Sequence, residues 1–186
     1  MLFRSLRTTR FQNLRCLTVR FTADSQEDRK VKSDLVDFLK ASNAPIEEFN
    51  LIDEWVDDED TIAILSLLHR LKKLRIKPSN TVMSYLELPS VPHHGAGRSL
   101  SPCPLTEEAT LDVKEVQAHS DNLSTIRSMI LSRAIGVQSD TPYDLPTCLK
   151  KVRLLCSWEE EKIWTNIIKD FRDLGLVVEI CRDFYN

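Results

Sequence analysis

The stretch KKVRLLCSWEEEKIWTNIIKDFRDLGLVVEI, residues 150–180, contains a complete strand, helix and strand pattern. Residues 150–156 are predicted to form a strand. Residues 159–174 repeat apolar side chains at helical spacing, with three glutamates at the start and Gly175 after the end, which favours an amphipathic helix. That apolar stripe consists of Ile163, Ile167, Phe171 and Leu174. Residues 176–180 (LVVEI) follow as a predicted buried strand.

The segment before this stretch supplies a further strand and helix. Residues 110–118 (TLDVKEVQA) suit a strand, and residues 123–135 suit a helix that stops at Gly136. The resulting order βαβαβ predicts a small sheet with two helices on one face, which is a two-layer sandwich.

The first half of the chain also mixes helices and strands. Residues 30–40 predict a short helix, and residues 49–52 predict a strand. A helix is predicted over 61–76, ended by Pro78, and a strand over 81–88, closed by Pro89. Residues 89–106 contain four prolines, two glycines and three serines, a composition typical of a flexible tether. The predicted fold class is therefore α+β, with two small αβ domains joined by a flexible linker.

The first 22 residues have the composition of a mitochondrial transit peptide. They contain five arginines, several hydroxyl residues and no acidic residue. The sequence therefore predicts a presequence over 1–22, cleaved near Phe21 or Thr22, and a mature protein in the mitochondrial matrix. The alternative is a basic arm that stays attached and binds RNA.

Charge and motifs restrict the function. Without residues 1–22 the formal charge is −8, although RNA-binding proteins are usually basic. Either one face stays basic or much of the contact is with protein. No stretch is long and apolar enough to span a bilayer, so no membrane contact is expected. The five cysteines are expected to be free thiols, and His93, His94 and Cys103 lack a further ligand at metal-site spacing. The chain contains none of the common nucleotide-binding, zinc-protease or hydrolase motifs, so we expect no enzyme activity, no catalytic residue and no cofactor.

A series of short motifs in one order resembles the bacterial-type translation initiation factor three family. Asn43 and Ile46 with Leu51 to Glu54 fit the opening of its N-terminal domain, and Tyr85 to Pro89 fits the closing strand. Val113 to Val116 fits the first strand of its C-terminal domain, and Lys151 to Leu155 and Asp170 to Glu179 fit later elements. The lysine-rich interdomain helix and the arginine-rich loop of that family are absent here. The resemblance implies a helical extension over 23–42, an N-terminal αβ domain over 43–89, a linker over 90–106 and a ribosome-binding αβ domain over 107–186.

The same resemblance implies a monomeric mitochondrial initiation factor. Such a protein binds ribosomal RNA and proteins of the small mitochondrial subunit, hinders premature joining of the large subunit and helps to select initiator tRNA at the start codon of mRNA. The candidate contacts are basic: Arg70, Lys72, Lys73, Arg75, Lys77, Lys114, Arg127, Arg133, Lys150, Lys151 and Arg153. Each of them could instead belong to a solvated helix face or strand edge. The alternative function is a mitochondrial large-subunit stalk protein, which also joins a helical region to a small αβ domain through a mobile linker.

Overall fold

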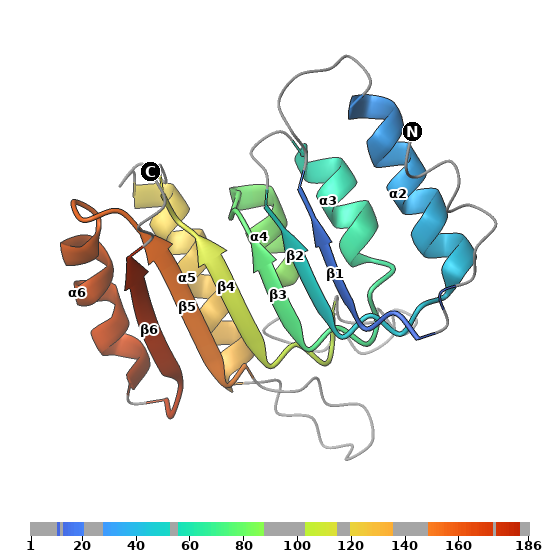
Figure 1. Cartoon of the computed structure of the whole chain (residues 1–186). Helices are drawn as coiled ribbons and strands as arrows, with labels where there is room; N and C mark the ends of the chain where they lie inside the picture. The colour runs from blue at the N-terminus through green and yellow to red at the C-terminus, as the bar shows by residue number, and fades with distance from the viewer. Residues whose placement is uncertain are drawn as a thin grey trace, which may run out of the picture.

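A computed structural model describes residues 11, 13–20, 28–52, 56–87, 103–114, 120–135, 149–172 and 174–182. Strands and helices alternate along this described part of the chain (Figure 1). The strands are β1 (Cys16–Val19), β2 (Glu48–Leu51), β3 (Lys73–Ile76), β4 (Glu108–Asp112), β5 (Lys151–Cys156) and β6 (Val177–Arg182). The helices are α2 (Asp28–Ser42), α3 (Asp58–Leu65), α4 (Asn80–Leu86), α5 (Ser120–Ile135) and α6 (Glu161–Arg172).

All six strands belong to one parallel sheet in the order β1-β2-β3-β4-β5-β6. Each connection therefore moves one strand along the sheet in the same direction. Because such crossovers are right-handed, the helices lie on one face of the sheet, as Figure 1 shows. This arrangement is that of a solenoid, in which each strand and helix unit stacks on its neighbours.

The α+β class is confirmed, but the division into two domains is not. β3, from the first predicted domain, pairs with β4, from the second, so the sheet is continuous across the predicted boundary. Most of the predicted linker lies outside the described residues. Its last part is described and packed, since Cys103 and Thr106 are both buried. The hydroxyl of Thr106 donates to the carbonyl oxygen of Leu71 at 3.4 Å.

Two predictions for the first half are wrong. The helix predicted over 61–76 is α3, which ends at Leu65, followed by turns and by β3 at residues 73–76. The strand predicted over 81–88 is the helix α4. Ser79 caps that helix, because its hydroxyl accepts from the backbone N–H of Val82 at 3.2 Å. Val82, Met83 and Leu86 are buried from α4, which is helical spacing.

The other predicted elements are confirmed with shifts of a few residues at their ends. The predicted helices at 30–40, 123–135 and 159–174 correspond to α2, α5 and α6. The predicted strands at 49–52, 110–118, 150–156 and 176–180 correspond to β2, β4, β5 and β6. The βαβαβ order of the second half is therefore confirmed as part of the longer sheet.

The core lies between the sheet and the helices. Alternate strand residues supply it, including Phe49 of β2, Leu111 of β4 and Leu154 of β5, all fully buried. From α6, Trp164 and Phe171 are buried against the same cluster. The strand residues that alternate with these core residues therefore point to the other side of the sheet, away from the helices.

β1 lies inside the predicted presequence. Val19 is buried in the core, and the ring of Phe11 packs edge-on against Phe38 with centroids 5.7 Å apart. The carbonyl oxygen of Arg15 accepts from the backbone N–H groups of Glu47 and Glu48 at 2.8 and 2.9 Å. Residues 11–19 thus make the same kinds of contact as the later strands, whereas the predicted cleavage site at residues 21 and 22 lies outside the described residues.

Among the described residues, no helix combines the length and apolar character needed to cross a membrane.

Candidate binding face on the open side of the sheet

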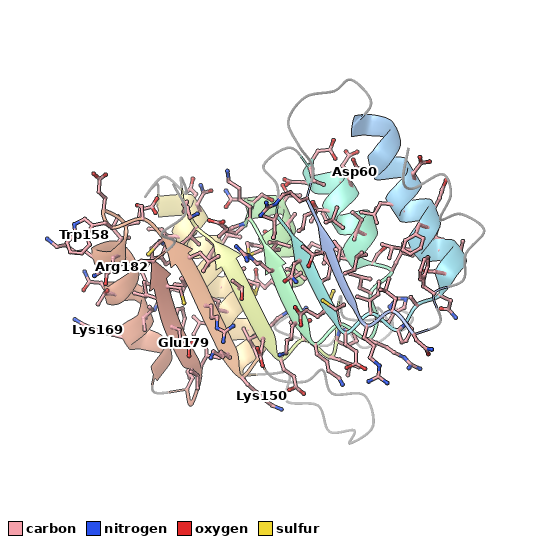
Figure 2. All side chains as sticks on the ribbon, viewed as in Figure 1. Asp60, Lys150, Trp158, Lys169, Glu179 and Arg182 are labelled. Atoms are coloured by element: carbon pink, nitrogen blue, oxygen red, sulfur yellow. The ribbon has the colours of Figure 1, made fainter. Side chains whose placement is uncertain are left out.

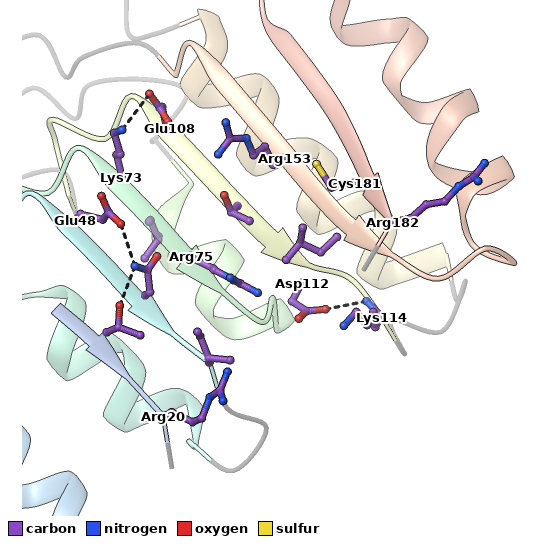
Figure 3. Close-up of a pocket in the computed structure, with 16 residues that line it drawn as sticks. Arg20, Glu48, Lys73, Arg75, Glu108, Asp112, Lys114, Arg153, Cys181 and Arg182 are labelled. Carbon is purple, nitrogen blue, oxygen red and sulfur yellow. Dashed lines mark hydrogen bonds and ion pairs between the residues drawn. The ribbon is translucent and has the colours of Figure 1, made fainter. Parts of the chain in front are cut away.

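One row of polar side chains crosses all six strands on the face that the helices leave uncovered. Register places these residues side by side from one strand to the next. The row consists of Thr18, Asn50, Arg75, Thr110, Arg153 and Glu179. We call this side of the sheet the open face. The open face lines a shallow hollow with a volume of about 830 Å³ (Figure 3).

The open face is more basic than the chain as a whole. The described residues that line the hollow include six cationic and three anionic side chains, whereas the whole chain has a formal net charge of −3. The cationic residues are Arg20, Lys73, Arg75, Lys114, Arg153 and Arg182, and the anionic residues are Glu48, Glu108 and Asp112. A hollow with this charge favours an anionic ligand.

Ion pairs connect neighbouring strands at their amino ends. Glu47 lies 3.0 Å from Lys72 and 3.6 Å from Arg15. Lys150 lies 3.1 Å from Glu107, and Lys73 lies 3.8 Å from Glu108. Lys151 and Glu179 form a further pair at 2.6 Å. We call these five ion pairs the amino-end ladder. Its cations already have carboxylate partners, so they contribute less than their number suggests to binding an external anion.

The ladder follows from a repeated sequence pattern. The pattern is six residues long and occurs at 14–19, 46–51, 71–76, 106–111 and 149–154. Its first position is apolar or threonine, and its second and third positions are mostly charged. Its fourth and sixth positions are apolar, and its fifth position is polar. The charged pairs are Glu-Glu at 47–48 and 107–108 and Lys-Lys at 72–73 and 150–151, so their sign alternates from strand to strand. The observed strand order therefore places opposite charges beside each other on neighbouring strands.

Glu179 provides a test of the ladder through its titration. Hydrogen bonds from Lys151 and then Arg153 hold the pKa of Glu179 below its ordinary value of 4.5. A lowered pKa means that the pairing stabilises the fold above pH 4.5, and that this contribution disappears as pH falls through the pKa in the folded protein. We expect Lys151→Ala to raise the pKa of Glu179 towards 4.5 in an NMR titration of its carboxyl carbon. Arg182→Ala is the control, and an equal rise in that variant would contradict the assignment.

Arg75 lies near the centre of the open face, between Asn50 and Thr110 (Figure 3). Asn50 donates to the hydroxyl of Thr18 and to the carboxylate of Glu48, both at 3.1 Å. Within the described part of the chain, Arg75 and Arg20 have no ion pair or hydrogen bond from their side chains. Their guanidinium groups are thus available to a ligand.

The structure brings some of the predicted contacts together and separates others. Lys73, Arg75, Lys114 and Arg153 line the hollow. Lys72, Lys150 and Lys151 belong to the amino-end ladder, and Arg70 is exposed in the turn before β3. Lys77 follows β3, and Arg127 is exposed on α5, away from the open face. The predicted contacts therefore do not form one surface.

Arg133 is wrong as a surface contact. Its side chain is only 2% exposed. Its Nε donates to the carbonyl oxygen of Leu86 at 2.6 Å, and its Nη1 donates to that of Cys103 at 3.1 Å. Burial lowers the pKa of this guanidinium. Arg133 instead ties the end of α4 and the turn at residue 103 to α5.

The prediction missed several residues of the hollow, and the polar or charged ones among them are Thr18, Arg20, Glu48, Asn50, Glu108, Thr110, Asp112 and Arg182. The repeated pattern would have found Asn50 and Thr110, because both occupy its polar position. Arg20 was assigned to the presequence instead.

A second exposed group lies beside the hollow, at the carboxyl ends of β5 and β6. The guanidinium of Arg182 is 4.4 Å from the ring centroid of Trp158, and it pairs with Glu161 at 2.9 Å. Figure 2 shows Trp158 and Arg182 together, at the opposite end of the sheet from Lys150. Trp158 is 70% exposed, so it adds an apolar surface at the rim.

Three of the described cysteines, Cys16, Cys103 and Cys156, are not activated nucleophiles. Burial raises the pKa of Cys103 to about 11, and burial also raises the pKa of Cys16 and Cys156. Thiols with raised pKa are protonated and unreactive near neutral pH. Among the described residues, no group of three or more His, Cys, Asp or Glu side chains is placed to hold a metal ion. His93 and His94 lie outside the described residues.

The chain was compared with protein-family models, with curated proteins and with solved structures, and no match was found in any of the three.

Proposed function

We propose that this chain is a binding protein that holds a protein partner on the open face of its sheet. The observation that carries this proposal is the unbroken polar row from Thr18 to Glu179 on the face without helices. In solenoids, stacked units create an extended surface suited to binding other macromolecules. The row offers hydroxyl, amide, guanidinium and carboxylate groups, which suit a polar protein surface or segment.

A photo-crosslinking experiment tests whether the open face is occupied. A benzophenone amino acid is introduced at Thr110, in the centre of the row, or at Lys169, exposed on α6, in the full chain expressed in cells. We expect a discrete crosslinked product from position 110 and none from position 169 after irradiation. Products from position 169 alone would overturn the proposal.

For the cellular role, we propose the one implied by the sequence resemblance: action in the mitochondrial matrix, without catalysis or a cofactor, at the small ribosomal subunit. There it would hinder premature joining of the large subunit and assist start-codon selection. The cationic excess of the hollow supports an anionic partner such as a ribosomal component. The continuous sheet differs from the two tethered domains that the resemblance implies, so this role depends on the sequence motifs.

Sedimentation of mitochondrial ribosomes tests this role. The initiation-factor proposal expects the protein with free small subunits and not with assembled monosomes. Migration with large subunits and monosomes would instead support the stalk-protein alternative. Recovery only at the top of the gradient would argue against both ribosomal roles while leaving the crosslinking test unaffected.

A further inference from the structure

We propose that the open face binds an extended acidic segment of a partner protein, and that the carboxyl-end part of the face anchors it. This inference rests on the proposed function, because it names the chemistry of the partner held there. The anchoring residues are Arg20 and Arg75.

The cations of the open face divide into paired and unpaired side chains, since Arg153 pairs with Glu179 and Arg182 pairs with Glu161, both at 2.9 Å. At the amino ends, the cations are paired with glutamates in the amino-end ladder, as in the contacts of Lys73 with Glu108 and of Lys151 with Glu179. Further along the strands, Arg75 and Arg20 have no side-chain partner in the described part of the chain. An added anion therefore gains most where the protein has not already neutralised its own cations.

The geometry at Arg75 suits a carboxylate. Arg75 is partly buried, and Thr110, beside it on β4, supplies a hydroxyl that can donate to a carboxylate. A guanidinium can form two parallel hydrogen bonds to one carboxylate, and such charged bonds are stronger than neutral ones. Arg20 follows β1, two strands from β3, so carboxylates spaced along one extended segment could reach both arginines.

The residues of the hollow favour a peptide over a nucleic acid. None of the described residues that line it is aromatic, and the ring of Trp158 at the rim already has the guanidinium of Arg182 over it at 4.4 Å, so the hollow itself offers no row of rings for stacking bases. Glu48, Glu108 and Asp112 are interspersed among the cations and would repel a continuous phosphate backbone. A peptide can instead place carboxylates at the arginines and neutral or basic groups beside these acids. The volume of about 830 Å³ is within the range of about 300 to 1,000 Å³ that is usual for ligand sites.

The test is a binding titration with defined probes. The purified full chain is titrated into a fluorescein-labelled peptide of alternating aspartate and glycine, its asparagine counterpart, or a labelled oligouridine, and anisotropy is recorded. We expect the aspartate peptide to bind about tenfold or more tightly than the asparagine peptide, because hydrogen bonds between a guanidinium and a carboxylate are stronger than those to a neutral amide. Added salt should weaken this binding.

Matched variants locate the binding site. Arg75→Glu is expected to weaken binding of the aspartate peptide about tenfold or more. Lys150→Glu changes the net charge by the same amount but lies in the amino-end ladder, so it is expected to change binding less than about twofold. Arg75→Gln provides a second variant that removes the charge without adding a carboxylate, and circular dichroism confirms that each variant is folded.

The outcomes separate this inference from the proposed function. Equal losses in Arg75→Glu and Lys150→Glu, or tighter binding of oligouridine than of the aspartate peptide, would overturn the acidic-peptide proposal. A crosslink from position 110 without binding of the aspartate peptide would also overturn it, while supporting a partner on the open face. Peptide binding without any crosslink from position 110 would overturn the proposed function instead.

Discussion

Removal of residues 1–20 is expected to lower the free energy of unfolding by roughly 4 kcal/mol or more, because complete burial of each large apolar side chain contributes about 1.5 to 3 kcal/mol. The deletion removes β1, with Val19 from the core and the partly buried Phe11, Leu14 and Leu17 packed against it. It also exposes the edge of β2, whose backbone groups then lose their strand partner.

Urea unfolding followed by tryptophan fluorescence measures this effect, since Trp164 is buried in the core. Deletion of residues 1–10 is the control, because it keeps every contact made by residues 11–19. We expect that shorter deletion to leave the unfolding midpoint close to that of the full chain. Equal midpoints for the full chain and the 1–20 deletion would show that β1 does not contribute to the folded state.

The same contacts bear on the presequence cleavage that the mitochondrial proposal implies. Cleavage near residues 21 and 22 would produce a mature chain without β1, whereas cleavage before residue 11 would keep it. Because residues 11–19 repeat the contacts and the sequence pattern of the later strands, we expect a mature amino terminus before Phe11. Amino-terminal sequencing of the protein purified from mitochondria measures this directly, and a start at residue 21 or later would contradict it.

Arg133→Ala is expected to lower the free energy of unfolding by about 3 kcal/mol, since leaving a buried polar group without a hydrogen bond costs about 1 to 3 kcal/mol. Two carbonyl oxygens, those of Leu86 and Cys103, lose their guanidinium donor. The shortened side chain also leaves unfilled space beside the small void lined by Leu86, Thr106 and Met129.

Arg127→Ala is the matched control, because Arg127 lies on the same helix but is exposed. Exposed ion pairs contribute about 0 to 1 kcal/mol, so its unfolding midpoint in urea should change little. Similar losses in the two variants would mean that α5 is sensitive to any change in helix composition, and that the buried hydrogen bonds are not the cause. Binding to the aspartate peptide should be equal in both folded variants, since neither residue lines the hollow.

Local periodicity was sufficient to predict the second half of the chain. The positions of α6 and β6 are set by residues close together in sequence, and both positions are confirmed. Their predicted burial is wrong in part, because α6 buries Trp164 and Ile168 beside Phe171, and no residue of β6 is buried. The first half was harder, because Ile64, Leu67, Leu68, Leu71 and Leu74 continue a helical spacing through the turn after α3. Pairing of β3 with β2 and β4 overrides that local pattern and makes residues 73–76 extended.

The candidate site was only partly predictable for the same reason. The sequence does not show whether a basic residue is buried in the core, held in an ion pair or exposed on the surface. Only its neighbours in the folded structure distinguish these cases. Arg133 was grouped with Arg75 from the sequence, yet one is buried against backbone carbonyls and the other lies on the open face. Charge alone therefore overestimated how many cations are available to a partner.

Local sequence patterns were enough to assign the α+β class, most element positions and the alternation of polar and apolar residues along the strands. The repeated pattern, whose charged pairs alternate in sign, is compatible with the observed order of neighbouring strands. Three features became visible only in the folded chain: both halves form one sheet, residues 16–19 are its first strand, and the polar positions join in one row. The physical reason is that hydrogen-bonded register connects residues far apart in the chain, and only this register determines which side chains share a surface.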